Sequence, residues 1–324
     1  MAEERIFLGF DIGGTKIGIG IISESGKFIA GDRIENKDTR PEDILPLLVE
    51  KTNKLFADNN LTKEDIVSFG ISSPGPADYA NGIMTTPPNN PLWRDVPILK
   101  YLSDNLGIRG YFENDANAAA LAEGYFGAGK GAKDYVYLTM STGIGAGIIA
   151  GGTLVQGSSF QGGEFGHSCL IPGGRECSCG LRGCYEAYCG GRAVARDLQK
   201  KLADKPDSMI VKCAGSVENI DMKALQEAVE ANDEFAVAYW DEMIERNAQA
   251  LGSLVQTINP AKIILGTFAW AAGDLFMNPL REKIVKYCWA ESYKNCEIVP
   301  SALRRDIGYY AGAAVAMYFE EKRK

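Results

Sequence analysis

Apolar residues come in short runs separated by glycine turns at two places in the chain. Residues 6–10, Ile-Phe-Leu-Gly-Phe, and residues 17–22, Ile-Gly-Ile-Gly-Ile-Ile, flank the turn at residues 11–16, and this pattern predicts two strands around a glycine turn. The same arrangement returns about 130 residues later, where a strand at residues 135–140 runs into the glycine-rich residues 141–147. This echo predicts two related α/β domains that face each other across a cleft.

The remaining elements follow from helical spacing of apolar residues and from short apolar runs between turns. The expected helices span residues 41–59, 117–125, 192–201, 222–231, 234–258, 275–287 and 308–324, and a further helix start is expected at residues 62–65. The other expected strands span residues 67–72, 109–112 and 261–265. The first domain is expected to comprise residues 1–122, completed by the C-terminal helix at 306–324, and the second residues 123–305.

Composition narrows the classes of protein. The 324 residues are 46% hydrophobic and 23% charged, with a formal net charge of −8. Neither nucleic acid nor an anionic membrane is expected as a partner, because both need a clustered basic patch. No apolar run approaches the roughly 18 residues of a membrane span, and the acidic N-terminus does not resemble a signal peptide. We therefore expect a cytoplasmic protein, in which the eight cysteines need a role other than disulfides.

The chain's densest cysteine stretch follows its only histidine. The four candidate metal ligands are His167, Cys177, Cys179 and Cys184. Three cysteines and one histidine are a standard ligand set for zinc, and the glycines between them allow a short loop to fold around an ion. Cys169 and Cys189 lie nearby, but a closed site needs only four ligands. The alternative, three buried thiols and a surface histidine, would not require the four to converge.

The two glycine turns are also candidate phosphate sites. One such turn, at residues 11–16, is explained as well by a simple hairpin, but a second at residues 141–145 suggests that both clamp a polyphosphate. Residues 124–130 spell the start of a Walker A motif, yet Gly131 stands where the magnesium-binding serine or threonine should be. That segment also follows a helix, so we expect a glycine-rich surface turn there.

A carboxylate marks the junction between the expected strand at residues 109–112 and the alanine-rich helix. In Glu113-Asn-Asp115 the last carboxylate would project into the cleft. The alternative is that this segment supplies only a helix cap, a role that Asx residues often fill.

Together these motifs resemble the ROK family of sugar kinases, within the actin–hexokinase superfamily. The resemblance covers nearly the whole chain, and it rests on the motifs at residues 11–16, 113–119, 141–147, 163–167 and 177–186. The last of these, Cys-x-Cys-Gly-x-x-Gly-Cys-x-Glu, is highly specific to the family, and the overall pattern is most similar to the bacterial glucokinase branch.

The resemblance implies an ATP-dependent hexose kinase that phosphorylates the sugar 6-hydroxyl, with glucose as the first choice of sugar. N-acetylglucosamine, N-acetylmannosamine and fructose are the alternatives. Structural zinc, magnesium with ATP, and a homodimer or homotetramer are implied as well.

The resemblance also implies roles for single residues. Asp115 would be the base that takes the proton of the 6-hydroxyl. The residues implied to line the sugar site are Gly75, Asn89 (for which Asn90 competes), Asn114, Glu164, His167 and Glu186. The residues implied to contact ATP are Gly13, Gly14, Thr15, Lys16, Thr142, Gly143 and Gly266, with Asp11 near the magnesium. His167 is expected to bind zinc through one ring nitrogen and the sugar through the other; zinc binding alone is the alternative.

One segment departs from the family pattern. The family usually carries a glycine run after the strand at residues 261–265 to receive the adenosine, and here the chain reads Gly266-Thr-Phe-Ala-Trp270. The bulk of Phe268 and Trp270 leaves the adenine contacts open.

Two other functions compete with the kinase. Transcriptional repressors of the same family carry a helix-turn-helix domain ahead of the first glycine turn, whereas ten residues precede Asp11 here and the chain is acidic. A zinc-stabilised sugar-binding protein without catalysis is the other alternative. Asp115 and the two glycine turns argue against this second alternative.

Overall fold

The computed structural model describes residues 4–87 and 91–323 and divides the chain into two compact units. The first unit comprises Met1–Gly131, Ser158–Phe160 and Ala302–Lys324, and the second Ala132–Gly157 and Gln161–Ser301. Each unit combines helices with its own five-stranded sheet, so the expected α/β class is confirmed.

The sheet of the first unit has the order β3-β2-β1-β4-β7. Its strands are β1 (Ile6–Ile12), β2 (Lys16–Ser23), β3 (Phe28–Glu35), β4 (Ile66–Ser73) and β7 (Gly110–Asn114). Strands β1, β2 and β3 pair antiparallel, while β4 and β7 join parallel to β1. The hairpin predicted around the first glycine turn is therefore present.

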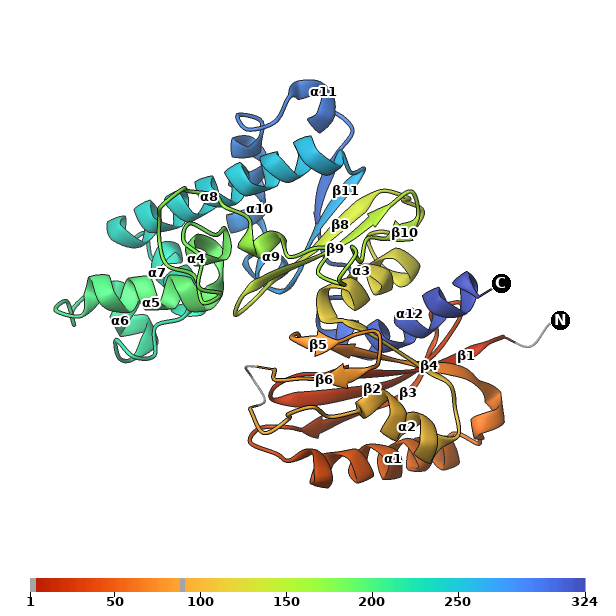
Figure 1. Cartoon of the computed structure of the whole chain (residues 1–324). Coiled ribbons are helices and arrows are strands. Elements are labelled where there is room, and N and C mark those ends of the chain that lie inside the picture. The colour runs from red at the N-terminus through yellow and green to blue at the C-terminus, as the bar shows by residue number, and fades with distance from the viewer. Residues whose placement is uncertain (1–3, 88–90, 324) are drawn as a thin grey trace. The chain divides into compact units, whose positions relative to one another are not determined.

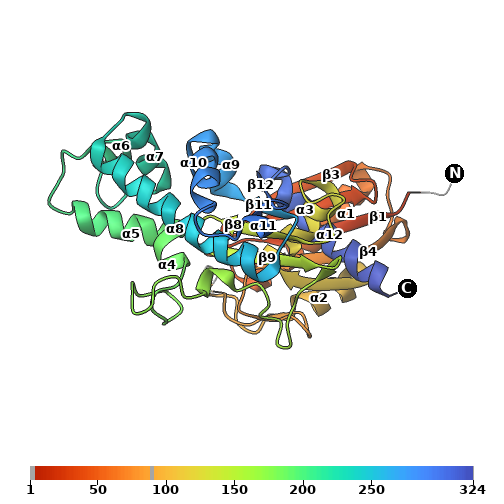
Figure 2. The ribbon, with the colours of Figure 1, turned by 90° about the horizontal axis from the view of Figure 1, so that it is seen from above.

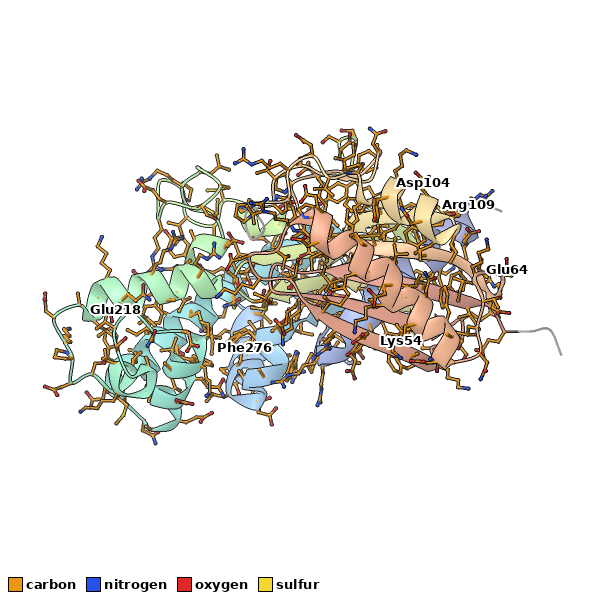
Figure 3. All side chains as sticks on the ribbon, turned by 90° about the horizontal axis from the view of Figure 1, so that it is seen from below. Lys54, Glu64, Asp104, Arg109, Glu218 and Phe276 are labelled. Atoms are coloured by element: carbon orange, nitrogen blue, oxygen red, sulfur yellow. The ribbon has the colours of Figure 1, made fainter. Side chains whose placement is uncertain are left out.

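Helices cover both faces of this sheet (Figure 1). Helices α1 (Pro41–Asp58) and α2 (Ile98–Leu106) lie on one face, and α3 (Asp115–Phe126) and α12 (Ile307–Lys322) lie on the other. The outer side of α1 is charged, and Lys54, labelled in Figure 3, lies 2.5 Å from Asp58 one turn along. A two-stranded ribbon of β5 (Ala77–Asp78) and β6 (Ile83–Met84) precedes α2.

Glycines in the strands let α12 approach the first sheet backbone to backbone. A Cβ at Gly9 of β1 would lie 2.4 Å from the backbone nitrogen of Ala313. A Cβ at Gly70 of β4 would lie 2.1 Å from the carbonyl oxygen of Gly312. Side chains of any size at these positions would push the helix off the sheet, and α12 is therefore an integral layer of the first unit.

The second unit repeats the same topology. Its strands are β8 (Tyr135–Met140), β9 (Ile144–Ala150), β10 (Thr153–Leu154), β11 (Lys262–Leu265) and β12 (Glu297–Pro300), in the order β10-β9-β8-β11-β12. Strands β8, β9 and β10 pair antiparallel, and β11 and β12 follow parallel to β8. The sequence echo is thus a repeated strand topology, with one glycine turn per unit joining its first two strands.

The longest helix of the second unit is α8 (Glu234–Ile258). The others are α4 (Glu186–Cys189), α5 (Gly191–Leu202), α6 (Met209–Ala214), α7 (Met222–Glu230), α9 (Thr267–Ala272), α10 (Asp274–Ile284) and α11 (Ala290–Tyr293). Figure 2 shows α5, α6 and α7 gathered at one end of α8, away from β8 and β9 of the same unit. Within the described ranges, no helix is both long and apolar enough to cross a membrane.

Some predicted elements differ from the structure. The expected helix start at residues 62–65 is a single 3-10 turn, Lys63–Asp65, which ends because the chain enters β4 at Ile66. The carboxylate of Asp65 accepts the backbone N–H of Thr62 at 2.7 Å, so the sequence signal for a helix cap was real but served one turn only. Strands β3, β5, β6, β10 and β12 and helices α2, α4, α6, α9 and α11 were not predicted.

Candidate functional site

Asp115 is the first residue of α3, at the point where β7 ends. The helix cap belongs to its neighbour: Asn114 Oδ1 accepts the backbone N–H groups of Ala116 at 2.9 Å and Asn117 at 3.3 Å. Asp115 Oδ1 accepts the Ala116 N–H at 2.8 Å, which sets its carboxylate at the positive end of the helix dipole. The capping role considered for this segment therefore falls to Asn114.

A network of hydrogen bonds around the buried Glu113 fixes the junction between β7 and α3. Glu113, 1% exposed, accepts the backbone N–H of Asn114 at 2.8 Å and the side-chain amide of Asn117 at 3.0 Å through Oε1. Asn114 in turn donates its amide to the Tyr79 hydroxyl at 3.2 Å. These bonds lock the strand-to-helix corner that carries Asp115. Sequence reasoning missed Tyr79, because only the fold brings it to this corner.

Gly75 lies beside the same corner. A Cβ at this position would be 3.1 Å from the Tyr79 hydroxyl, so the glycine backbone closely approaches the group that Asn114 contacts. Asn89 and its rival Asn90 lie outside the described residues.

A second carboxylate belongs to the electrostatic surroundings of Asp115. Asp11, at the end of β1, accepts the Ser72 hydroxyl of β4 at 2.7 Å. Burial, with a smaller contribution from the charge of Asp115, raises the pKa of Asp11 to about 6 against the lowering effect of the Ser72 hydrogen bond. Two carboxylates in this relation favour a nearby cation, which suits a residue implied to lie near magnesium.

The first glycine turn joins β1 to β2. The Gly13 N–H donates to the Lys16 carbonyl at 2.9 Å and closes the turn. Gly14 is half-buried, whereas Thr15 and Lys16 are exposed at the turn's surface. Lys16 Nζ lies 3.3 Å from a carboxylate oxygen of Glu35 in β3.

The second glycine turn, between β8 and β9, is tied to Glu186. The Ser141 N–H donates to the Gly143 carbonyl at 3.0 Å, and Thr142 between them is exposed. Glu186 Oε2 accepts the Ile144 N–H at 2.7 Å, and a Cβ at Gly143 would lie 2.4 Å from that oxygen. The predicted phosphate turn and the predicted sugar-binding glutamate are therefore in direct contact, and a side chain at Gly143 would displace the Glu186 carboxylate from the Ile144 N–H.

The structure brings the four candidate metal ligands together. The ligand atoms of His167, Cys177, Cys179 and Cys184 all lie within 4.8 Å of one another. Cys179 Sγ and Cys184 Sγ are 3.7 Å apart, and Cys177 Sγ is 3.6 Å from His167 Nδ1. A tetrahedral zinc with ordinary bond lengths would set sulfur atoms roughly 3.8 Å apart and sulfur and nitrogen roughly 3.6 Å apart. The residues therefore fit zinc in number, type and spacing.

His167 uses its two ring nitrogens in different directions. It ends the 3-10 turn Phe165–His167, with Nδ1 toward the thiol cluster and Nε2 4.0 Å from Glu164 Oε2. A ring with one nitrogen on a metal typically places the other against a polar group that fixes its orientation. This geometry links the cluster to Glu164.

The cysteine loop is anchored to neighbouring helices. The Arg175 guanidinium donates to Asp197 of α5 at 2.9 Å, and the Tyr239 hydroxyl of α8 donates to the same carboxylate at 2.8 Å. The guanidinium also lies over the Tyr188 ring, 4.7 Å from its centroid.

The segment that departs from the family's glycine run folds as α9. A Cβ at Gly266 would lie 2.4 Å from the Tyr137 hydroxyl, so this glycine is required by packing. Phe268 is directed into the core, where its ring packs edge-on against Phe276 with centroids 5.0 Å apart. Trp270 is half-buried. The Phe268 side chain therefore packs inside the second unit.

The described site residues that the sequence predicted are divided between the two units. Those of the first unit are Asp11, Gly13, Gly14, Thr15, Lys16, Gly75, Asn114 and Asp115. Those of the second unit are Thr142, Gly143, Glu164, His167, Cys177, Cys179, Cys184, Glu186 and Gly266.

Comparisons with known proteins cover almost the whole chain. The model of the ROK family matches residues 7–318. A glucokinase from Thermotoga maritima is 36% identical over 309 residues, which are 95% of this chain and 96% of that protein. The ROK hexokinase structure from Thermus thermophilus has a TM-score of 0.85 at 31% identity, covering 98% of this chain and 100% of that one.

A ROK family glucokinase from Streptomyces griseus, solved in complex with glucose and AMPPNP, has a TM-score of 0.79 at 29% identity. It covers 97% of this chain and 99% of that one. The resemblance carried by the motifs is confirmed by matches in both sequence and structure, and the chain belongs to the ROK family.

Proposed function

We propose that this protein is an ATP-dependent glucokinase, which transfers the γ-phosphoryl group of ATP to the 6-hydroxyl of glucose. The observation that carries the proposal is the fixed carboxylate of Asp115. It stands at the start of α3, capped by Asn114 and supported by buried Glu113, in a chain whose relatives include glucokinases and a ROK hexokinase.

Asp115 acts as the general base. It accepts the proton of the sugar 6-hydroxyl while that oxygen forms a bond to the γ-phosphorus. The bond between the γ-phosphorus and the bridging oxygen breaks, and ADP leaves with that oxygen. The proton then passes from Asp115 to solvent. A positioned base contributes about 10²–10⁴-fold to such a reaction.

The two glycine turns bind the phosphates of ATP. Gly13, Gly14, Thr15 and Lys16 act from the first unit, and Thr142, Gly143 and Gly266 act from the second. Magnesium bound to ATP supplies charge neutralisation on the transferred group. Asp11 would lie toward it, because burial together with Asp115 makes this carboxylate a favourable neighbour for a cation.

Asn114, Glu164, His167 and Glu186 hold the sugar's other hydroxyls, with the backbone of Gly75 alongside. Carboxylates suit this task because they accept hydroxyl hydrogens in strong charge-assisted bonds. Supporting this, Glu186 is locked by the Ile144 N–H and by Ser178 Oγ at 3.3 Å. N-acetylglucosamine, N-acetylmannosamine and fructose are the alternative acceptors.

The metal is a structural zinc. His167 would hold it through Nδ1, and the thiolates of Cys177, Cys179 and Cys184 would supply the other three ligands, so the ion would stabilise the loop and take no part in the chemistry. The support is the fit of the sulfur–sulfur and sulfur–nitrogen spacings to zinc bond lengths. His167 then keeps Nε2 for Glu164 or a sugar hydroxyl.

A coupled ADP-release assay over a panel of sugars tests the proposal. We expect the highest kcat/KM with glucose and, for Asp115→Asn, turnover lower by at least about 10²-fold with the glucose affinity nearly unchanged. Near wild-type turnover in Asp115→Asn would remove this residue from its role. No sugar-dependent ADP release by the wild-type protein would overturn the kinase itself.

A further inference from the structure

Asn36 is a buried asparagine that holds the first glycine turn at two points. It follows β3 directly and is 1% exposed. Its side-chain amide Nδ2 donates to the Gly13 carbonyl at 2.7 Å, and its backbone N–H donates to the Thr15 carbonyl at 2.7 Å. One residue from a neighbouring strand end therefore fixes two of the turn's carbonyl groups.

The amide of Asn36 has its own orientation fixed. The Thr39 hydroxyl donates to Asn36 Oδ1 at 2.5 Å, so the oxygen end of the amide faces Thr39 and the NH₂ end must face Gly13. Trp93, fully buried, donates its indole N–H to the Thr39 carbonyl at 3.2 Å. The contacts thus run from a core tryptophan through Thr39 and Asn36 to the turn.

Fixing these carbonyls also fixes the amides that follow them. A trans peptide is planar, so the N–H of one residue points opposite to the carbonyl before it. With the Gly13 carbonyl held on Asn36, the direction of the Gly14 N–H is set, and the Thr15 carbonyl sets that of Lys16 in the same way. Glycine pairs have many backbone conformations open to them. Without the Asn36 side chain, the turn would keep the hairpin bond from Gly13 to Lys16 and the backbone bond to the Thr15 carbonyl, but it would lose the bond that holds the Gly13 carbonyl.

We infer that Asn36 is a positioning residue for ATP, which pre-orders the phosphate-binding turn and is itself oriented by Thr39 and Trp93. The inference rests on the proposed function, because that function gives the turn its ligand. Loss of the Asn36 amide leaves the sugar-binding groups untouched. The effect must therefore appear in ATP binding and spare glucose.

Two substitutions separate positioning from simple loss of stability. Asn36→Ala removes the donor to Gly13, and Thr39→Val removes the hydroxyl that orients the amide while keeping its shape. Thr39→Ser restores that hydroxyl and serves as the rescue. The matched control is Thr52→Val in α1, since Thr52 is a fully buried threonine whose hydroxyl donates to the Leu48 carbonyl at 2.8 Å.

We expect Asn36→Ala to raise the KM for ATP about tenfold, the order of one lost hydrogen bond, and to leave the KM for glucose within about twofold. Thr39→Val should raise the KM for ATP by a smaller factor. Thr39→Ser and Thr52→Val should have the KM values of the wild type. Equal rises in both KM values for Asn36→Ala, or an unchanged KM for ATP, would overturn the inference.

Calorimetric binding of magnesium and AMPPNP gives a second readout that does not depend on turnover. Weaker nucleotide binding by Asn36→Ala than by wild type supports the inference, whichever sugar is the acceptor. A finding that glucose is not the acceptor would count against the proposed function alone. If Asn36→Ala fails to fold, the comparison of Thr39→Val with Thr39→Ser decides. Equal nucleotide affinity of those two variants would refute the positioning role.

Discussion

Asp11→Asn should make the protein more stable and less active. In the folded chain, burial raises the pKa of Asp11 to about 6 from an ordinary 3.8, with the charge of Asp115 adding to the rise. The folded state therefore holds this proton more tightly than the unfolded state. The contribution of Asp11 to the free energy of unfolding is therefore fully present below about pH 4. It is lost as the pH rises through about 6 and is absent at pH 7.5.

The size of the effect follows from the shift. About two pKa units correspond to ~3 kcal/mol, and partial exposure of the half-buried side chain reduces this to ~2 kcal/mol. Asparagine removes the charge but keeps an oxygen to accept the Ser72 hydroxyl, which lies 2.7 Å from Asp11 Oδ1. At roughly 2–4 °C per kcal/mol, the melting temperature of the variant should rise by about 5 °C at pH 7.5.

Thermal melts of wild type and Asp11→Asn from pH 5 to 8, without nucleotide or magnesium, measure this gain. The difference between the two should shrink toward pH 5, where Asp11 becomes protonated, and turnover with glucose should fall in the variant. A variant equal to or less stable than wild type at pH 7.5 would refute the reasoning, as would a gain that is the same at every pH.

Two further predictions concern the metal loop. Freshly prepared, chelator-free protein should carry one zinc per chain by metal analysis, and zinc-free wild type would contradict the cluster's role. Cys177→Ser should lower both the zinc content and the melting temperature, whereas Cys213→Ser, outside the cluster, should change neither. His167→Gln should raise the KM for glucose far more than the KM for ATP, because Nε2 is directed toward Glu164 at 4.0 Å; steady-state kinetics with equal losses, or a loss confined to ATP, would show that His167 serves zinc alone.

Features carried by local sequence were predictable. The glycine hairpins at β1–β2 and β8–β9 and the long helix α8 follow from apolar periodicity, which local neighbours determine. The three cysteines of the cluster follow His167 within 17 residues, so ligand type and spacing alone could identify the four ligands.

Features that depend on contacts between distant parts of the chain could not be predicted from the sequence. Strand β3 contains Gly31, Asp32 and Arg33 in its middle, which breaks the apolar pattern of a strand. Helix α9 lies where the chain departs from the family's glycine run, and no local pattern showed that Phe268 would pack into the core. Asn36 acts on Gly13 across 23 positions, a contact that no local pattern encodes. The homodimer or homotetramer and the cytoplasmic location stay predictions.

The identity of the product tests the central claim most directly. Wild-type protein would be incubated with ATP, magnesium and ¹³C-labelled glucose, and the product followed by phosphorus and carbon NMR, with Asp115→Asn in parallel. The account predicts a phosphate ester whose phosphorus couples to carbon 6, formed at least about 10²-fold more slowly by the variant. A phosphate on another carbon, no phosphorylated sugar, or equal rates for the two proteins would contradict it.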